Sequence, residues 1–433
     1  MDRASIVALD RAHVWHPYTP MDAWETTDPI VVARAAGAWL EDVDGTRYLD
    51  GNSSWYVAGL GHGHPRLHGA LRAQLETLDH CALAGIAHEP AALLAQELLA
   101  TAPRGLTRVF YTDDGSTAVD AAVKICAQGW KQLGKPGKTR FIALDGAFHG
   151  DTVGATSLGG VDVFRRPYSA VTFECVHVPF PAADAFERAF AAVSTLLRDE
   201  SASIAAVFVE PVVQGAGGMR IYDPAFLREL RALCDAHDVW LVADEVFTGY
   251  GRTGPMWACE HAGIAPDIMC LGKAFSAIVP MGAVLASDRV FDAFRGSRDR
   301  ALLHGHTFCG NPVGAALARE VLAIYRDEHV LEGVARKAPL IARAFERIAA
   351  LPGVERVRSI GMIGAADLMD TREGYLGGIG WRVYDEARRR GAYLRPLGST
   401  VYVCPPLVID DGDLSGLLSI VEESVRAVTL TSR

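Results

Sequence analysis

The sequence predicts an α/β protein with a largely parallel sheet. Two observations support this fold class. Short apolar runs bounded by turn residues recur between residues 107 and 290, and they alternate with segments of helical length. Runs that are apolar throughout are typical of strands buried on both faces of a sheet. The chain has 433 residues, half of them apolar, which allows a large core and more than one domain.

Charge and cysteine usage exclude several classes of protein. The formal net charge is -10 and no lysine–arginine block occurs, so we expect no nucleic-acid partner. The eight cysteines form no C-x-x-C pair and several lie in apolar runs, as expected of reduced thiols in a cytoplasmic protein. Asp2, Arg3 and Asp10 interrupt any secretory signal, and the weakly polar stretch 274–286 is too short to span a bilayer. We expect a soluble, cytoplasmic protein with small-molecule substrates.

The N-terminal 60 residues are predicted to form an irregular arm followed by a small β unit. The segment 15–19, WHPYT, cannot be regular helix because of its proline. Residues 38–50 indicate a hairpin that turns at Asp44–Gly45. His62 and His64 follow in a glycine-rich loop with no third ligand nearby, so we assign them turn or packing roles and predict no metal site.

The remaining elements follow in order. Residues 66–102 are mostly helical, with breaks near Gly85 and Pro90. The expected strands are 107–111, 140–144, 204–209, 239–244, 268–271 and 279–286, and the expected helices are 118–132, 224–238 (capped by Asp223), one opening at 312, and 411–425. Strand 279–286 is predicted to lie at a sheet edge because it contains Pro280. A second β unit is expected at 392–398 and 401–403.

The domain organisation is predicted from a shift in composition near residue 327. Residues 61–326 carry the strand-and-helix alternation and the loops with polar side chains, and we expect them to form one large domain. Residues 1–60 and 327–433 contain short strands and helices without such loops. We therefore expect these two terminal segments to form one small domain beside the large one.

Two of the apolar runs end in residues that point to a specific chemistry. One run ends in Asp244 and another in Gly272–Lys273. In parallel sheets, ligands collect at the carboxyl ends of the strands. Pyridoxal phosphate (PLP) needs a lysine to hold its aldehyde as a Schiff base and a carboxylate to keep its pyridine nitrogen protonated. Each residue also has a simpler interpretation: Asp244 could cap a turn, and Lys273 could be a surface lysine.

A second pattern in the same stretch points to a different class of ligand. Residues 249–254 match G-x-G-x-x-G and follow a strand, which is the arrangement of a dinucleotide site. However, Asp244 and Glu245 lie between the strand and the glycines, where they would repel a pyrophosphate. No clear helix start follows Gly254, so the pattern is weak.

Two further loops fit a cofactor with a phosphate and a flat ring. Gly115 and Ser116 stand between a strand and a helix, where free amides and the positive helix end hold phosphate groups. The alternative is an ordinary N-cap by Ser116. Phe148 follows strand 140–144, where an aromatic ring can stack on a cofactor, although it could equally pack in the core.

Together these motifs resemble the class III (ω-) aminotransferases of PLP fold type I. The matching segments are DDGSTAVDAAVK, FHGDTVGATS, EPVVQGAGG, ADEVFTGYGRTG, CLGKA and HTFCGNP, spread over most of the chain. The resemblance implies a large PLP-binding domain and a small α+β domain. It also implies that Lys273 holds PLP and moves the substrate proton, that Asp244 pairs with the pyridinium nitrogen, and that Phe148 stacks on the ring. Gly115 and Ser116 would hold the phosphate.

The resemblance also implies residues for the substrate and for the partner subunit. Thr307 would reach the phosphate of the neighbouring subunit's cofactor, which implies a homodimer with active sites at the subunit interface. Arg395 would bind a remote carboxylate of the substrate, for which a bidentate guanidinium is well suited. The remaining substrate-binding residues would be Tyr18, Trp55, Tyr56 and Gly305, besides Phe148 and Lys273.

Overall fold

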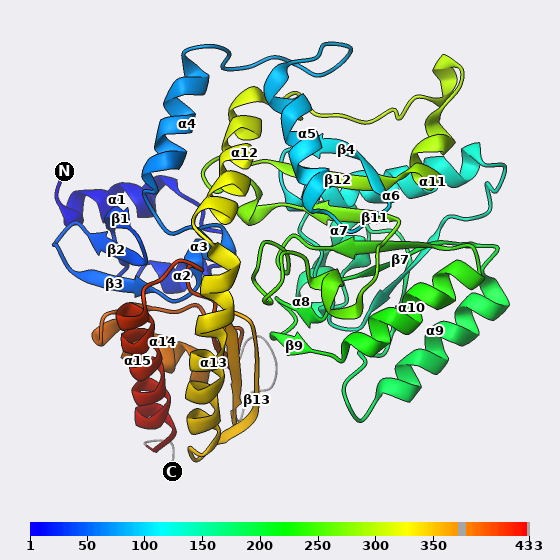
Figure 1. Ribbon diagram of the computed structural model, residues 1–433. Coiled ribbons are helices and arrows are strands. Elements are labelled where there is room, and N and C mark those ends of the chain that lie inside the picture. Colours follow the sequence, from blue (N-terminus) through cyan, green and yellow to red (C-terminus); the bar gives the residue numbers. More distant parts are fainter. Residues whose placement is uncertain (371–377, 431–433) are drawn as a thin grey trace.

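The computed structural model describes residues 1–370 and 378–430, and its centre is a seven-stranded sheet (Figure 1). The strand order is β4-β12-β11-β10-β7-β5-β6, and every neighbouring pair is parallel except the two that β12 makes. The strands are β4 (Leu106–Thr112), β5 (Arg140–Leu144), β6 (Cys175–Val178), β7 (Ile204–Val209), β10 (Trp240–Asp244), β11 (Ile268–Leu271) and β12 (Gly282–Ser287). This sheet confirms the predicted α/β class.

The sheet is buried on both faces, which explains its uninterrupted apolar runs. In β7, Ala206 and Phe208 join one hydrophobic cluster, whereas Val207 and Val209 join another. Successive side chains of a strand point to opposite faces, so the two clusters lie on opposite sides of the sheet. Helix α6 (Gly115–Gln132) supplies the first cluster, and helices α9 (Phe186–Glu200) and α10 (Pro224–Ala236) supply the second. Figure 1 shows α9 and α10 side by side.

The position predicted for the strand near Pro280 is wrong. Strand β12 lies inside the sheet, where Val284 pairs with Cys270 of β11 on one side and with Phe110 of β4 on the other. Pro280 precedes the first paired residue, Gly282, so its missing N–H removes no hydrogen bond from the sheet. The edge strands are β4 and β6.

A second region joins the two ends of the chain. Strands β1 (Val32–Ala36), β2 (Trp39–Asp42) and β3 (Arg47–Asp50) form a sheet with β15 (Ala392–Tyr393) from the C-terminal part. Strands β13 (Val354–Ile360), β14 (Ile363–Leu368) and β16 (Thr400–Val403) form another, covered by α13 (Val330–Ala349). In Figure 1 the blue N-terminal and the orange to red C-terminal elements lie together. On this basis we propose the small domain, residues 1–60 and 327–433, beside the large domain 61–326.

The N-terminal arm departs from the prediction because it begins with a helix. Helix α1 (Arg3–His13) is capped by Asp2, whose side chain accepts a hydrogen bond from the Ser5 amide. None of its residues is buried, so tertiary packing contributes little to this helix. The predicted hairpin is present as β2 and β3, and the side chain of Asp42 accepts the amides of Asp44 and Thr46 in its turn.

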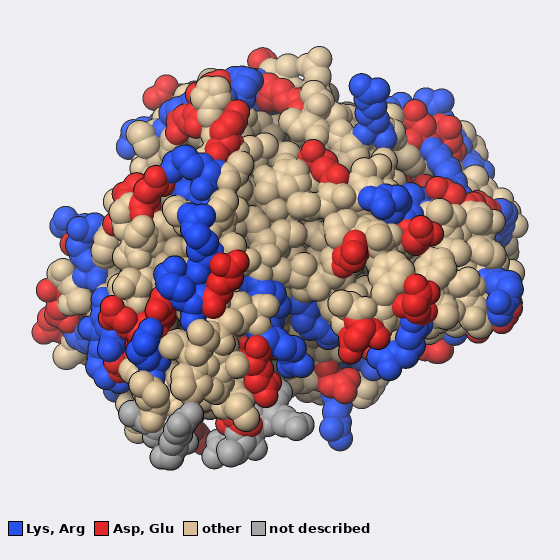
Figure 2. All heavy atoms as spheres, turned by 60° about the horizontal axis from the view of Figure 1, so that its bottom comes forward, with Lys and Arg blue, Asp and Glu red and all other residues tan. Residues whose placement is uncertain are grey.

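The remaining elements connect these layers. They are α2 (Met21–Trp24), α3 (Ser53–Tyr56), α4 (Pro65–Leu75), α5 (Glu89–Thr101), α7 (Val153–Leu158), α8 (Asp162–Arg165), β8 (Val213–Gln214), β9 (Arg220–Ile221), α11 (Asp288–Phe291), α12 (Pro312–Asp327), α14 (Ile379–Arg389) and α15 (Asp411–Leu430). Within the described residues, none of the helices has the length and apolar character needed to cross a membrane. Acidic and basic side chains are interspersed over the face shown in Figure 2.

Candidate active site

A cavity of about 770 Å³ lies where strands β4, β5, β7, β10 and β11 end. Nine of the eleven residues predicted from the sequence line it: Tyr18, Trp55, Tyr56, Gly115, Ser116, Phe148, Asp244, Lys273 and Arg395. Gly305 and Thr307 do not line it. Both belong to the segment between β12 and α12, and the expectation for Thr307 concerns the neighbouring subunit, so their roles stay predictions.

Lys273 lies in the cavity because the backbone at the end of β11 closely approaches the backbone at the start of α6. It follows β11, and a Cβ added to the preceding Gly272 would lie 2.8 Å from both the Cα and the amide nitrogen of Gly115. Only glycine fits there, so the end of β11 lies against the start of α6. Lys273 itself has a φ of +50°, a left-handed conformation that costs a non-glycine residue about 1–2 kcal/mol. Such strain is typical of functional positions.

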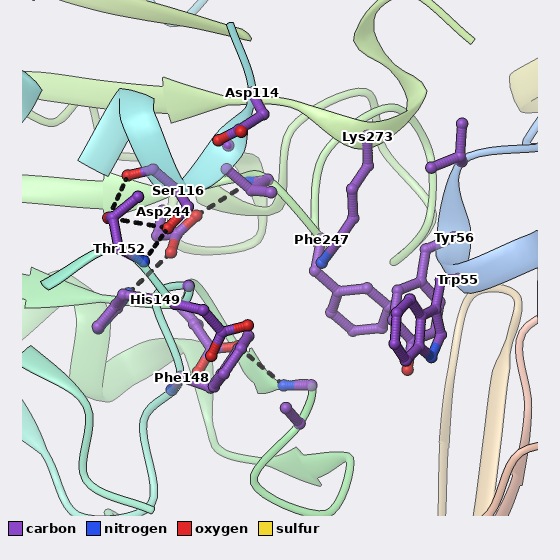
Figure 3. Close-up of a pocket in the computed structure, with 18 of the residues that line it drawn as sticks. Trp55, Tyr56, Asp114, Ser116, Phe148, His149, Thr152, Asp244, Phe247 and Lys273 are labelled. Carbon is purple, nitrogen blue, oxygen red and sulfur yellow. Dashed lines mark hydrogen bonds and ion pairs between the residues drawn. The ribbon is translucent and has the colours of Figure 1, made fainter. Parts of the chain in front are cut away.

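The amine of Lys273 lies beside aromatic rings in the wall of the cavity. Its Nζ is 5.0 Å from the ring centre of Tyr56 and 5.4 Å from that of Phe247. Figure 3 shows the side chain extending toward these two rings, with Asp244 and His149 across the cavity. Burial lowers the pKa of Lys273, although the charges of Asp244 and Glu210 partly oppose the shift. A neutral amine is the form that acts as a nucleophile or base.

Asp244 is held in place by a histidine that the sequence analysis did not single out. Nδ1 of His149 lies 2.7 Å from Oδ2 of Asp244, and both side chains are buried. Burial lowers the pKa of His149, but the hydrogen bond to Asp244 and the charges of Asp244 and Glu210 outweigh it and raise that pKa. The signal in the sequence was the position of His149, directly after Phe148 in the same loop.

Glu210 is a second buried group that the sequence analysis missed. It follows β7, lines the cavity, and accepts hydrogen bonds from the amides of Phe148 (3.0 Å) and Gly215 (2.9 Å). These bonds fix the loops after β5 and β7 relative to each other. Burial raises the pKa of Glu210 to about 7, and the charge of Asp244 adds to the shift while His149 opposes it.

We expect the substitution Glu210→Gln to flatten the pH dependence of stability. Between 4.5, the ordinary pKa of a glutamate, and about 7, the folded protein keeps a proton on Glu210 that the unfolded chain releases. Stability therefore falls as pH rises through this window, by on the order of 3 kcal/mol from this group. Glutamine does not titrate. The melting temperature, measured from about pH 5 to about pH 8, checks this prediction.

The matched control is Glu187→Gln, because Glu187 is an exposed glutamate in the first turn of α9. It should keep the wild-type slope. A Glu210→Gln protein whose melting temperature falls as steeply as that of the wild type would contradict the assignment of the pKa to Glu210.

The start of α6 offers unpaired amides to the cavity. The cap is Asp114, whose side chain accepts the Thr117 amide, so the alternative of an N-cap by Ser116 is wrong. Gly115 and Ser116 occupy the first two helical positions, which have no acceptor within the helix. The Ser116 hydroxyl lies 3.0 Å from that of Thr152, which also lines the cavity. Amides, hydroxyls and the positive helix end together suit a phosphate.

Phe148 faces the cavity and does not pack in the hydrophobic core. It is half-buried, its ring makes an edge contact with Phe164 at 5.4 Å, and both residues line the cavity. One face of a flat ligand could therefore rest on Phe148.

The far wall of the cavity is aromatic and ends in a guanidinium. Trp55 and Tyr56 lie in α3, where residues 53–56 have φ values of +50°, +44°, +59° and +73°. This left-handed turn presents both rings to the cavity. The guanidinium of Arg395 lies 4.8 Å from the ring centre of Trp55. Tyr18, whose hydroxyl donates a hydrogen bond to Asp151, makes an edge contact with Trp55 at 5.7 Å.

The structure does not support the dinucleotide alternative at residues 249–254. The next helical segment is a short 3-10 turn, Ala258–Ala262, and no α-helix starts at Gly254 to hold a pyrophosphate. His62 and His64 lie beside carboxylates, with His62 2.9 Å from Asp50 and His64 3.4 Å from Glu328.

The fold and the site together define the class of the protein. The family described as "Aminotransferase class-III" matches residues 21–425, and the chain belongs to this family. It is 39% identical over 448 residues to the adenosylmethionine-8-amino-7-oxononanoate aminotransferase of Geobacter sulfurreducens, covering 99% of both chains. It is 37% identical to the protein of the same name from Mycobacterium leprae, covering 96% of both.

Solved structures agree with this assignment. The aminotransferase of the same name from Methanocaldococcus jannaschii superposes with a TM-score of 0.95 at 30% identity, covering 98% of this chain and 99% of that one. The omega transaminase from Pseudomonas jessenii in complex with PMP has a TM-score of 0.93 at 29% identity, covering 98% of both. The chain is therefore a PLP-dependent aminotransferase.

The residues present fit that cofactor. A half-buried lysine, a buried aspartate, a half-buried phenylalanine and the amides at the start of α6 all face one cavity. PLP requires an amine partner, a carboxylate for the pyridine nitrogen, a phosphate site and a surface for its ring. The cavity supplies each of the four.

Proposed function

We propose that the protein transfers an amino group from S-adenosylmethionine to 8-amino-7-oxononanoate and so forms 7,8-diaminononanoate in biotin biosynthesis. Its relatives from Geobacter sulfurreducens and Mycobacterium leprae carry the name of that reaction. The two half-reactions share one cavity, in which the cofactor stores the amino group between donor and acceptor.

The observation that carries this proposal is the order of groups along the aromatic wall. The amine of Lys273 lies over Tyr56, Tyr56 adjoins Trp55, and the guanidinium of Arg395 lies over Trp55. The wall therefore runs from an amine, across apolar surface, to a fixed positive charge. An acceptor with a reacting ketone, an apolar chain and a distant carboxylate matches this order.

Each protein group has a defined task in this proposal. Asp244 pairs with the pyridinium nitrogen, and His149 orients the carboxylate through its hydrogen bond. Gly115 and Ser116 bind the phosphate, and Phe148 supports the ring. Lys273 would hold the cofactor through its amine, and once a substrate amine has freed it, this amine would be the base placed to move the proton of the substrate carbon.

S-adenosylmethionine is supported as the donor by the aromatic lining. Tyr18, Trp55 and Tyr56 present ring faces and edges to the cavity, and such rings attract a sulfonium cation. A second candidate is the same reaction with lysine as donor, or the reaction of another class III ω-aminotransferase that acts on a terminal amine or ω-amino acid. This candidate is favoured by Phe148, which brings no hydroxyl to the cavity, and by the fold shared with the omega transaminase.

An amino-donor comparison tests the proposed function. Purified protein is given 8-amino-7-oxononanoate with S-adenosylmethionine, lysine or simple amines, and 7,8-diaminononanoate is measured. Of these amino donors, we expect only S-adenosylmethionine to give product. Turnover with lysine or simple amines, and none with S-adenosylmethionine, would select the second candidate.

We expect Arg395→Ala to weaken acceptor binding. Loss of a charge-assisted hydrogen bond costs about 1.5–3 kcal/mol, so the KM for 8-amino-7-oxononanoate should rise about 10- to 100-fold with a smaller change in kcat. Arg395→Lys keeps the positive charge but loses the bidentate guanidinium, so its KM should lie between those of the wild type and Arg395→Ala. Steady-state kinetics check this, and an unchanged KM would assign the carboxylate to another residue.

We further propose a cytoplasmic homodimer in which Thr307 contacts the partner's cofactor. The segment that carries Thr307 exposes large apolar side chains, with Leu303 82% and Phe308 59% exposed, as expected of a surface that a second copy covers. All eight cysteines are unpaired, which suits a reducing compartment.

A further inference from the structure

One group of metal-ligating side chains lies outside the cavity. Asp113, His306 and Cys309 each place one potential ligand atom within 4.8 Å of the other two. Asp113 ends the turn after β4, directly before the cap of α6, whereas His306 and Cys309 belong to the segment between β12 and α12. Among the described residues, no other group of three or more such side chains meets that spacing. Neither the sequence analysis nor the proposed reaction assigns this group a role.

We propose that Asp113, His306 and Cys309 form a zinc site that fastens the segment 304–311 to the start of α6. A thiol, an imidazole and a carboxylate are the ligand types that Zn²⁺ accepts, and sulfur disfavours Mg²⁺ and Ca²⁺. In a tetrahedral site with bonds of about 2.0–2.3 Å, neighbouring ligand atoms lie about 3.3–3.8 Å apart. The three ligand atoms, none more than 4.8 Å from another, lie close to this spacing.

The local backbone already holds two of the ligands in the required arrangement. His306 and Cys309 lie in one turn, in which the Cys309 amide donates to the His306 carbonyl at 3.2 Å. The His306 amide in turn donates to Sγ of Cys309 at 3.1 Å. Hydrogen bonds of this kind orient metal ligands and stabilise a thiolate. The thiol proton passes to solvent when the zinc–sulfur bond forms.

The carboxylate of Asp113, at the start of α6, provides the third ligand. Oδ2 of Asp113 lies 2.9 Å from Nδ1 of His306, while Oδ1 is buried without a hydrogen-bond partner among the described residues. A buried carboxylate oxygen that lacks a partner is costly, and a cation satisfies it. In the single chain the side chains of Asp113 and His306 are about one third exposed, which leaves room for a water in the fourth position.

The site would couple two segments that the proposed function assigns to phosphate binding. Asp113 precedes Gly115 and Ser116 by two and three residues, and His306 precedes Thr307. A bound zinc ion therefore links the turn at the start of α6 to the loop that carries Thr307. The binding of zinc itself does not depend on the identity of the substrate.

Protection of Cys309 from alkylation tests the proposal in the intact holoenzyme. After free PLP and any bound metal are removed by dialysis, first against EDTA and then against metal-free buffer, the protein is treated with iodoacetamide with and without one equivalent of ZnCl₂, and each cysteine is quantified by peptide mass spectrometry. Cys81 is the internal control, because it is the other cysteine that is not fully buried. We expect zinc to slow alkylation of Cys309 about tenfold or more and to leave Cys81 unchanged.

Variants in the other two ligands complete the experiment. His306→Gln and Asp113→Asn should each abolish protection of Cys309. Each should also lower the zinc retained after loading with ZnCl₂ and dialysis against chelator-free buffer from one ion per chain toward none. Substitution with Co²⁺ should give visible d–d bands of a tetrahedral thiolate site, at wavelengths longer than the cofactor absorbs. Equal alkylation of Cys309 with and without zinc, or equal zinc retention by all variants, would overturn the proposal.

Discussion

Replacement of Lys273 by alanine is expected to lower turnover about 10²–10⁴-fold, the range observed when a positioned general base is lost. The reason is that the amine of Lys273, whose pKa burial lowers, is the group placed to move the substrate proton. The cofactor should still bind, because its phosphate and ring contacts come from Gly115, Ser116 and Phe148. Single-turnover kinetics and the absorbance of the bound cofactor measure the two effects separately.

Two controls separate chemistry from charge and folding. Lys273→Arg keeps a positive charge but provides no nucleophilic amine, so it should be as inactive as the alanine variant. Lys138→Ala removes a buried lysine, whose pKa burial lowers to about 8 and which donates to the carbonyls of Ser201, Ile204 and Asp238 outside the cavity. Its folded fraction should keep full activity per bound cofactor. Near-normal turnover of Lys273→Ala would refute the assigned role.

The substitution Asp244→Asn is expected to cost about 10²–10³ in kcat, the range for removing one preorganised electrostatic partner. Asparagine has the same shape and can still accept the hydrogen bond from His149, so the pocket should be preserved. It lacks the charge that keeps a pyridine nitrogen protonated. Steady-state kinetics measure the loss, and the absorbance spectrum should report an altered cofactor.

The matched control is Asp223→Asn. Asp223 caps α10 by accepting the Ala225 amide, and asparagine caps a helix as well as aspartate does. This variant should be indistinguishable from the wild type. If Asp244→Asn retained the activity of Asp223→Asn, the cofactor's nitrogen would have to be stabilised by another group.

The sequence was sufficient to predict the strands of the central sheet because these strands are buried on both faces. Runs such as Ile204–Val209 and Ile268–Leu271 are apolar throughout, and their bounds agree with the structure. The interior position of β12 was not predictable from Pro280, since a proline just before a strand removes no sheet hydrogen bond. Helix α1 was missed because it has no buried face.

The sequence was sufficient for those site residues whose type and position at a strand end indicate their chemistry. Asp244 and Lys273 are two such residues, and the structure places both in one cavity. His149 and Glu210 were missed because their roles depend on contacts between loops that are distant in sequence. His149 meets Asp244 across 95 positions, and Glu210 meets the amide of Phe148 across 62. The cluster of Asp113 with His306 likewise joins residues 193 positions apart.

The central claim, that Lys273 binds the cofactor in the cavity containing Asp244, is tested most directly by borohydride reduction of the purified protein. Reduction fixes the cofactor to the lysine that holds it, and peptide mass spectrometry identifies that lysine among the six in the chain. We predict bleaching of a yellow protein and a single modified lysine, Lys273. Modification at any other lysine, or a colourless protein that takes up no added PLP, would contradict the account.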